Sequence, residues 1–219
     1  MLTLVEEIIL LTLEDKSGKF IHVPEHCIRY ALSGAVLMEL AFLGRIDTDP
    51  KRLFVTDREA VDDDLLDPVL GRICGSKEQH DCSYWIVEVG RDAKDIRERA
   101  LERLCDKGIL NVHEDLFLWV FRSRRYPSAR DGSSERKEVK LRMMSLLFSD
   151  EIPAPRDIAI MGLADTCGIF ARLLARPERE RAQARIDAIR KLELIARTVN
   201  GSVFDIEIEL ARAMTMRPY

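Results

Sequence analysis

The chain has 219 residues and a formal net charge of −4, with 47% hydrophobic and 33% charged residues. This composition is typical of a soluble globular protein and argues against a disordered chain or an integral membrane protein. The length allows one compact domain with a sizeable core, so we expect residues 1–219 to form a single domain. Because the net charge is negative, binding to nucleic acid or acidic lipid would need a local basic patch.

The first twenty residues, MLTLVEEIILLTLEDKSGKF, predict a helix rather than a targeting signal. Thr3 and Glu6 have the spacing of a capping box, and the helix is expected to run to about Leu13. Glu6 and Glu7 occupy positions where a signal peptide carries Lys or Arg, and no small-residue cleavage site follows. The five cysteines are scattered and form no C-x-x-C pair, which favours reduced thiols. These features predict a cytosolic protein.

The stretch CIRYALSGAVLMELAFLGRI, at 27–46, is strongly apolar. Between its two flanking arginines, Arg29 and Arg45, the only charged residue is Glu39. A transmembrane helix needs about 20 consecutive apolar residues, and the arginines bracket fewer than that. Apolar residues on nearly every face predict a helix surrounded by protein. We therefore expect a core helix, with Pro24 in its first turn.

The end of this core helix has a pattern that recurs later in the chain. In each copy, two leucines three residues apart precede a glycine, a short polar stretch and a β-like run. The copies are Leu37, Leu40 and Gly44 before RLFVT, and Leu101, Leu104 and Gly108 before LFLWVF. A glycine at this place ends a helix. Each copy therefore predicts a helix, a short strand, a turn and a returning strand, which together form a helix-plus-wing unit.

Two groups of residues have side chains that bind metals, but their spacing does not favour a metal site. The run Asp62–Asp64 precedes LLDPVLGRI, where an acidic helix start is the simpler interpretation and a carboxylate metal cluster is the alternative. Cys74, His80 and Cys82 offer three ligands, whereas zinc sites show tighter pairing and a fourth ligand. Gly-rich phosphate loops, G-x-S-x-G and H-E-x-x-H are absent from the sequence. We expect no metal, no cofactor and no enzymatic activity.

The segment at 122–142, RSRRYPSARDGSSERKEVKLR, is strongly basic. It holds three acids, Asp131, Glu135 and Glu138, and eight basic residues, Arg122, Arg124, Arg125, Arg130, Arg136, Lys137, Lys140 and Arg142. Its Asp-Gly-Ser-Ser centre is typical of turns, so we expect an exposed basic loop or hairpin at about 122–140. Beyond it, 157–175 predicts a nearly all-apolar helix and 177–199 a long amphipathic one. The fold class is therefore mainly α, a single globular domain with a buried helical-bundle core, surrounding amphipathic helices and short β-hairpins.

The helix of the second copy, in KDIRERALERL, carries a candidate anion site. Lys94 and Arg97 are three residues apart and share one face near the start of this helix. Free backbone N–H groups at a helix start also favour an anion. The alternative is a charged face that is simply solvated.

Five segments, in this order along the chain, resemble the Golgi phosphoprotein 3 family. They are LTLVEEIILLTLEDKSGKF, YALSGAVLMELAFLGRI, DDDLLDPVL, DIRERALERLCDKGIL and MGLADTCGIFARLL, and the resemblance extends from about Leu4 to Leu210. It implies one α-helical domain around buried helices. It also implies recognition of phosphatidylinositol 4-phosphate and, in eukaryotes, retention of glycosyltransferases in the Golgi by their cytosolic tails. Because the long N-terminal extension of the Golgi members is missing, a bacterial, cytosolic relative is expected.

The resemblance also implies a lipid site. The family's two basic residues, three apart, fall on Lys94 and Arg97, whereas its tryptophan and arginine near the core helix are replaced by Pro24 and Ser33. Arg29, one turn before Ser33, is expected to bring a guanidinium to a similar place. Loss of the tryptophan removes an interfacial anchor.

These observations lead to one functional expectation with two alternatives. We expect a non-enzymatic peripheral membrane protein of the cytoplasm, on Golgi membranes only in a eukaryote, that binds anionic phospholipid head groups of the phosphoinositide kind. The loop at 122–140 is a candidate for homo-oligomer contact or for contact with an anionic membrane. The alternatives are a winged-helix-like regulator that binds nucleic acid, which the negative net charge makes unlikely, and a protein-interaction scaffold.

Overall fold

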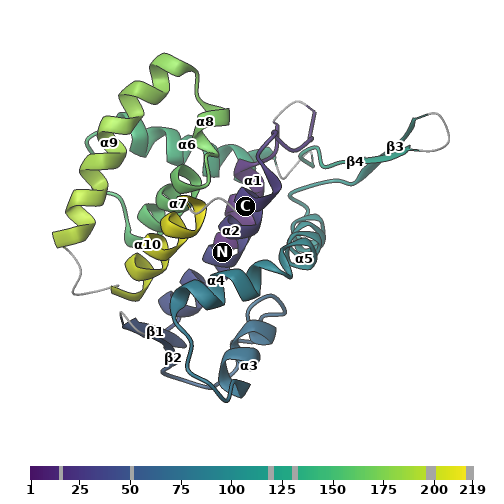
Figure 1. The fold of residues 1–219 in the computed structure, drawn as a ribbon. Helices are drawn as coiled ribbons and strands as arrows, with labels where there is room; N and C mark the ends of the chain where they lie inside the picture. Colours follow the sequence, from purple (N-terminus) through teal and green to yellow (C-terminus); the bar gives the residue numbers. More distant parts are fainter. Residues whose placement is uncertain (15–16, 50–51, 118–120, 130–132, 196–200, 216–219) are drawn as a thin grey trace.

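The computed structural model of the chain describes residues 1–219 except 15–16, 50–51, 118–120, 130–132, 196–200 and 216–219. The described part forms ten helices and two antiparallel hairpins (Figure 1). The helices are α1 (Leu4–Leu11), α2 (Glu25–Phe42), α3 (Asp67–Gly75), α4 (Cys82–Gly90), α5 (Ala93–Asp106), α6 (Ser133–Phe148), α7 (Pro155–Thr166), α8 (Phe170–Leu173), α9 (Arg176–Ile195) and α10 (Gly201–Thr215). The strands are β1 (Ile46–Asp49), β2 (Arg52–Val55), β3 (His113–Phe117) and β4 (Phe121–Arg125). The predicted mainly α fold class is confirmed.

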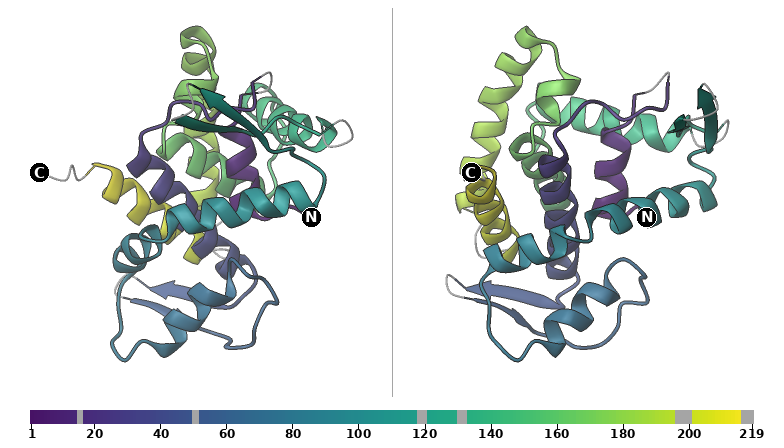
Figure 2. Two further views of the ribbon diagram at one scale, coloured as in Figure 1. Left: turned by 90° about the vertical axis from the view of Figure 1, so that its right-hand side faces the viewer. Right: turned by 45° about the vertical axis from the view of Figure 1, so that its right-hand side comes forward.

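Helix α2 lies at the centre of the molecule, as its apolar sequence predicts. Every residue from Ala31 to Leu40 is buried, and α1, α4, α5, α7 and α10 all pack against the helix (Figures 1 and 2). Gly34 lets two of these helices approach closely, because a Cβ atom there would lie 2.8 Å from Leu163 Cδ2. The sequence predicted Pro24 in the first turn of α2, whereas in the structure it is the N-cap residue, directly before that turn. None of the helices in the described part of the chain is both long and apolar enough to cross a membrane.

The single charged residue in the buried part of α2, Glu39, is fully paired. Its carboxylate accepts two hydrogen bonds from Arg156 of α7, at 2.7 and 3.0 Å, and one from the backbone N–H of Leu4, at 2.6 Å. The last of these satisfies a free amide at the start of α1. Glu39 therefore ties α1 and α7 to the central helix, which explains how the core tolerates a charge.

Helix α1 is buried along its whole length, including two acidic residues. The predicted capping box is confirmed, with Thr3 and Glu6 bonded to each other's backbone N–H. Glu6 also pairs at 2.6 Å with Lys107, the C-cap residue of α5, and Glu7 pairs with Arg142 of α6. Burial raises the pKa of Glu7 above its ordinary value, although the nearby arginine counteracts part of this effect.

The predicted repeat is confirmed as two units of the same local structure. The first unit is α2, Gly44, β1 and β2, and the second is α5, Gly108, β3 and β4. Both glycines are left-handed, with φ of +67° and +69°. In both units the residue after the glycine donates its backbone N–H to the carbonyl five residues earlier: Arg45 donates to Leu40 and Ile109 donates to Leu104, each at 2.9 Å. In the second unit the run LFLWVF extends from β3 into β4, and its residues 118–120 lie outside the described part.

Two helix boundaries differ from the sequence predictions. The apolar segment 157–175 was predicted as one helix, but α7 ends at Thr166 and a separate short helix α8 follows. The break occurs at Gly168, which has a φ of +70° and a terminating bond from Ile169 N–H to the Ala164 carbonyl. The helix predicted at 177–199 corresponds to α9, which begins at Arg176. Its predicted end, at residue 199, lies outside the described residues.

Candidate functional site

The basic segment at 122–142 does not form the continuous exposed loop that the sequence predicted. It consists of β4, a connection and most of α6. Arg136 is only 1% exposed and donates a hydrogen bond to Ser128, while Arg142 pairs with Glu7 and, at 2.9 Å, with Asp157. The prediction of exposure is therefore wrong for Arg136, because tertiary packing covers it, whereas Arg142 is partly exposed and ion-paired.

The remaining basic residues of this segment differ in their surroundings. Lys137 is exposed, whereas Lys140 is partly buried and donates a hydrogen bond to the Leu13 carbonyl at 2.7 Å. The side chains of Arg122, Arg124 and Arg130, and of the acids Asp131 and Glu135, lie outside the described part of the structure. A role of this segment in oligomer contact stays a prediction.

The predicted anion-site residues lie in the first two turns of α5. Lys94 is exposed. Arg97 is partly buried, and its guanidinium carbon lies 5.5 Å from the centre of the Phe20 ring, in a cation–π contact. Phe20 belongs to the segment that leads into α2, so this contact brings Arg97 next to the approach to the core helix.

Arg29 extends from α2 to the end of α4. Its Nε atom donates a hydrogen bond of 3.2 Å to the carbonyl of Gly90, the last residue of α4 and three residues before α5 begins. A Cβ at Gly90 would lie 4.0 Å from both the Arg29 guanidinium and the Ser33 hydroxyl, which is an ordinary contact distance, so this approach does not depend on the glycine. Pro24 is exposed at the start of α2. We call Lys94, Arg97 and Arg29 the basic cluster.

The start of α5 leaves backbone N–H groups available beside the basic cluster. Asp92 is the N-cap residue, but its side chain makes no capping hydrogen bond and instead pairs with Arg72 at 2.6 Å. The amides of a helix's first turn have no partner within the helix. Uncapped amides together with the positive end of the helix dipole favour an anion.

The acids around this helix start are engaged with other arginines. Asp95 pairs with Arg99 at 2.9 Å, and Glu88 pairs with Arg91 at 2.6 Å. Across the residues that the structure describes, no carboxylate lies within ion-pair distance of the basic cluster. Three cations without a protein counter-ion can bind a phosphate through charge-assisted hydrogen bonds.

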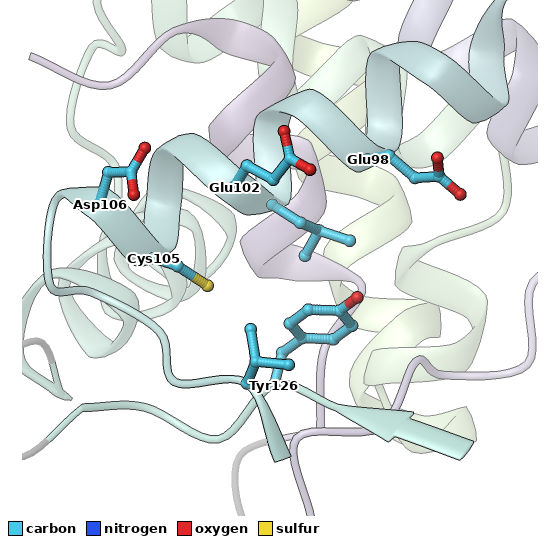
Figure 3. A pocket seen from close by; sticks show the side chains of 7 residues that line it. Glu98, Glu102, Cys105, Asp106 and Tyr126 are labelled. Carbon is cyan, nitrogen blue, oxygen red and sulfur yellow. The ribbon is translucent and has the colours of Figure 1, made fainter. Parts of the chain in front are cut away.

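One side of α5 presents three acids to a pocket, a feature that the sequence predictions missed. A pocket of about 310 Å³ is lined there by Glu98, Leu101, Glu102, Cys105, Asp106, Val112 and Tyr126 (Figure 3). The three acids recur every four residues, and this spacing is the signal that would have found them. The pKa of the Cys105 thiol is raised by burial and by the carboxylates of Asp106 and Glu102, so the thiol is protonated and a poor nucleophile at neutral pH.

The residues with metal-binding side chains serve other purposes in this structure. Asp63 accepts hydrogen bonds from the backbone of the turn before α3 and pairs with Arg103 at 2.9 Å. His80 stacks on Tyr84 with ring centres 3.7 Å apart, and burial raises the pKa of the Cys82 thiol. Among the residues that the structure describes, no three His, Cys, Asp or Glu residues are grouped as metal ligands.

Comparison with known proteins gives a consistent result. A sequence profile of the family described as Golgi phosphoprotein 3 (GPP34) matches residues 4–206. The chain is 34% identical over 168 residues to vacuolar protein sorting-associated protein 74 of Schizosaccharomyces pombe, which covers 68% of the chain and 49% of that protein. It is 30% identical over 166 residues to the protein of the same name from Eremothecium gossypii, with 67% and 49% covered. The chain thus spans about half the length of these curated relatives.

Proposed function

Because the chain belongs to the Golgi phosphoprotein 3 family, we propose that it is a non-catalytic peripheral membrane protein that binds anionic lipid head groups at the basic cluster. The observations that support this proposal are the hydrogen bond of Arg29 to Gly90, three residues before α5, and the position of Lys94 and Arg97 in the first two turns of that helix, which has no side-chain cap. The head group is of the phosphoinositide kind, and the protein acts in the cytoplasm, on Golgi membranes in a eukaryote.

The chemistry of the cluster fits a phosphate ester. A guanidinium offers paired N–H donors in a fixed plane, and Lys94 adds a mobile ammonium group. The backbone amides at the start of α5 add donors that are not occupied by a capping side chain, so a phosphate need not displace one. Each basic residue near an acidic membrane surface contributes about 1 kcal/mol, so three of them give binding that is weak alone and strongly dependent on salt.

Vesicle sedimentation tests the proposal directly. The parent protein should bind phosphatidylcholine vesicles that contain phosphatidylinositol 4-phosphate, and binding should fall as salt rises. Changing Lys94 and Arg97 together to Ala should weaken it by about thirty-fold, which corresponds to about 2 kcal/mol for two residues, and adding Arg29→Ala should weaken it further. Vesicles with phosphatidylglycerol at matched charge show whether the head group itself matters.

A matched control removes the same charge elsewhere. Arg58 and Lys77 are exposed and lie near the far end of α2, next to β2 and α3. Their double change to Ala should leave vesicle binding nearly unchanged. The proposal fails if the Lys94 and Arg97 double variant binds like the parent, or if the control loses as much.

A parallel gel retardation assay tests the nucleic-acid alternative. The helix of the first unit is buried from Ala31 to Leu40 and has no face that can enter a DNA groove. We therefore expect no retardation of duplex DNA at physiological salt. Retardation that disappears with the Lys94 and Arg97 changes would instead assign the basic cluster to nucleic acid.

A further inference from the structure

A groove between α6 and α8 combines exposed apolar side chains with cations. It has a volume of about 370 Å³ and is lined by Lys137, Lys140, Leu141, Met144 and Leu173. Leu141 is 66% exposed, although α6 packs on the core through its other side. We call this the α6–α8 groove.

The apolar face continues along α6. Leu141, Met144 and Phe148 follow at spacings of three and four residues, and so lie on one side of the helix. The opposite side is buried, with Val139, Met143, Leu146 and Leu147 in the core. Phe148 is 42% exposed and has the guanidinium carbon of Arg181 at 5.6 Å from its ring centre. The outer face of α6 is therefore an apolar stripe with cations at both ends.

A series of short contacts connects this groove to Arg97 of the basic cluster. Lys140 donates a hydrogen bond to the Leu13 carbonyl, and Leu13 pairs with Phe20 in an isolated β-bridge. Phe20 in turn lies under the guanidinium of Arg97. The groove and the basic cluster therefore flank the same stretch of chain between α1 and α2.

We propose that the α6–α8 groove is a second contact with an anionic bilayer, in which Leu141 enters the acyl region while the exposed Lys137 lies at the lipid phosphates. An exposed apolar side chain one helical turn from a lysine suits interfacial insertion, since the lysine stem lies in the apolar layer and its ammonium group reaches the head groups. The inference rests on the proposed function and adds a salt-independent term to it.

A protein partner fits this surface less well than a bilayer does. A stable protein interface buries about 800 Å² on each partner, whereas the groove offers one protruding leucine and a narrow stripe. The cations beside it favour an anionic surface, and the bilayer bound by the basic cluster would already be close. A second copy of the chain covering the groove is the outcome that the oligomeric state would reveal.

The decisive variant is Leu141→Gln, and its matched control is Leu43→Gln. Leu43 is 43% exposed at the other end of α2, far from the basic cluster along the helix. Both changes replace an exposed leucine by a good helix former without altering charge. On vesicles of 70% phosphatidylcholine and 30% phosphatidylglycerol, Leu141→Gln should weaken binding about ten-fold, with most of the loss visible at high salt, and Leu43→Gln should have no effect.

A fluorescence measurement distinguishes insertion from head-group binding. The variant Leu141→Trp should be quenched by phospholipids brominated in their acyl chains, and Leu43→Trp should not be quenched beyond the parent protein. Full vesicle binding by Leu141→Gln, together with weak binding by the Lys94 and Arg97 double variant, would overturn the second contact and leave the proposed function intact. A change in oligomeric state caused by Leu141→Gln in the absence of vesicles would overturn it too, because the groove would then be a protein interface.

Discussion

The two helix–glycine–hairpin units have the same local structure and opposite surroundings. In the first unit, α2 is enclosed by five helices and β1 packs against α10. In the second unit, α5 lies at the surface, and the β3–β4 hairpin extends away from the helices (Figures 1 and 2). Both glycines adopt nearly the same φ, and both helices end in the same hydrogen-bond pattern. The comparison shows that a local sequence pattern fixes where a helix ends, but not what the helix does.

The charges of the two units differ in the same way. The buried part of α2 holds one charge, Glu39, which is fully paired and serves stability. Helix α5 carries charges of both signs along its whole length, with Lys94 and Arg97 in its first two turns and the acids Glu98, Glu102 and Asp106 lining the pocket in Figure 3. Changing charges in the first unit should therefore unfold the protein, and changing them in the second should alter binding.

The largest expected effect is that of Glu39→Ala in the first unit. The change leaves Arg156 and the Leu4 amide without their partner in a buried region, so the free energy of unfolding should fall by about 3 kcal/mol. Urea denaturation followed by circular dichroism measures this. The matched change in the second unit is Glu102→Ala, at an exposed position. Its free energy of unfolding should stay within about 0.5 kcal/mol of that of the parent. Equal losses would remove the contrast between the units.

The two glycines should give an intermediate and equal effect. Gly44→Ala and Gly108→Ala each force a Cβ into the left-handed region, at a cost of about 1 kcal/mol. No atom lies within 4 Å of the added Cβ at either site, so the cost comes from the backbone alone. Thermal unfolding of both variants checks this. A loss at Gly44 several times that at Gly108 would mean that the surroundings, and not the local pattern, determine how the helices end.

The helix that contacts both units, α1, should show a pH dependence through Glu7. Burial raises the pKa of this carboxyl in the folded protein above 4.5, so the folded state holds its proton more tightly than the unfolded chain. Its contribution to stability is therefore fully present below pH 4.5 and is lost as the pH rises through the folded pKa. Glu7→Gln should flatten the dependence of unfolding free energy on pH in this window. An unchanged slope would assign the dependence to other carboxylates.

The smallest expected effect concerns charges within the second unit. Glu98 follows Lys94 by one helical turn, and Glu102 follows Glu98 by another. Changing both acids to Gln should reduce repulsion from an acidic membrane and strengthen vesicle binding by about two- to three-fold at low salt. The gain should disappear at high salt because exposed charges are then screened. A loss of binding would show that the acids help to orient the protein on the membrane.

Much of the fold was predictable because it depends on interactions between residues close together in the chain. The capping box of Thr3 and Glu6 and the glycine ends of α2 and α5 each involve residues within about five positions of one another. The burial of α2 followed from apolar residues on every face of one helix. Gly168 shows the limit of this reasoning, because the same kind of stop divides a segment whose apolar composition predicted one helix.

The candidate site was predictable only in part. Lys94 and Arg97 are neighbours on one helix and could be paired by spacing, whereas the contact of Arg29 with Gly90 joins residues 61 positions apart. Likewise, the basic composition of 122–142 gave no indication that Arg136 would be buried while Leu141 is exposed. Periodicity predicts that a helix has two faces, but the neighbouring elements determine which face they cover.

The sequence by itself determined the helical class, the core helix, the capping box and the two glycine stops, because each of these depends on short-range backbone geometry and on the hydrophobicity of one segment. Only the tertiary structure decided which charges became buried partners, such as Glu39 and Arg156, and which remained at the surface for a ligand. The physical reason is that the cost of burying a charge depends on the partner that long-range packing supplies. That partner is not encoded in the spacing around the charge.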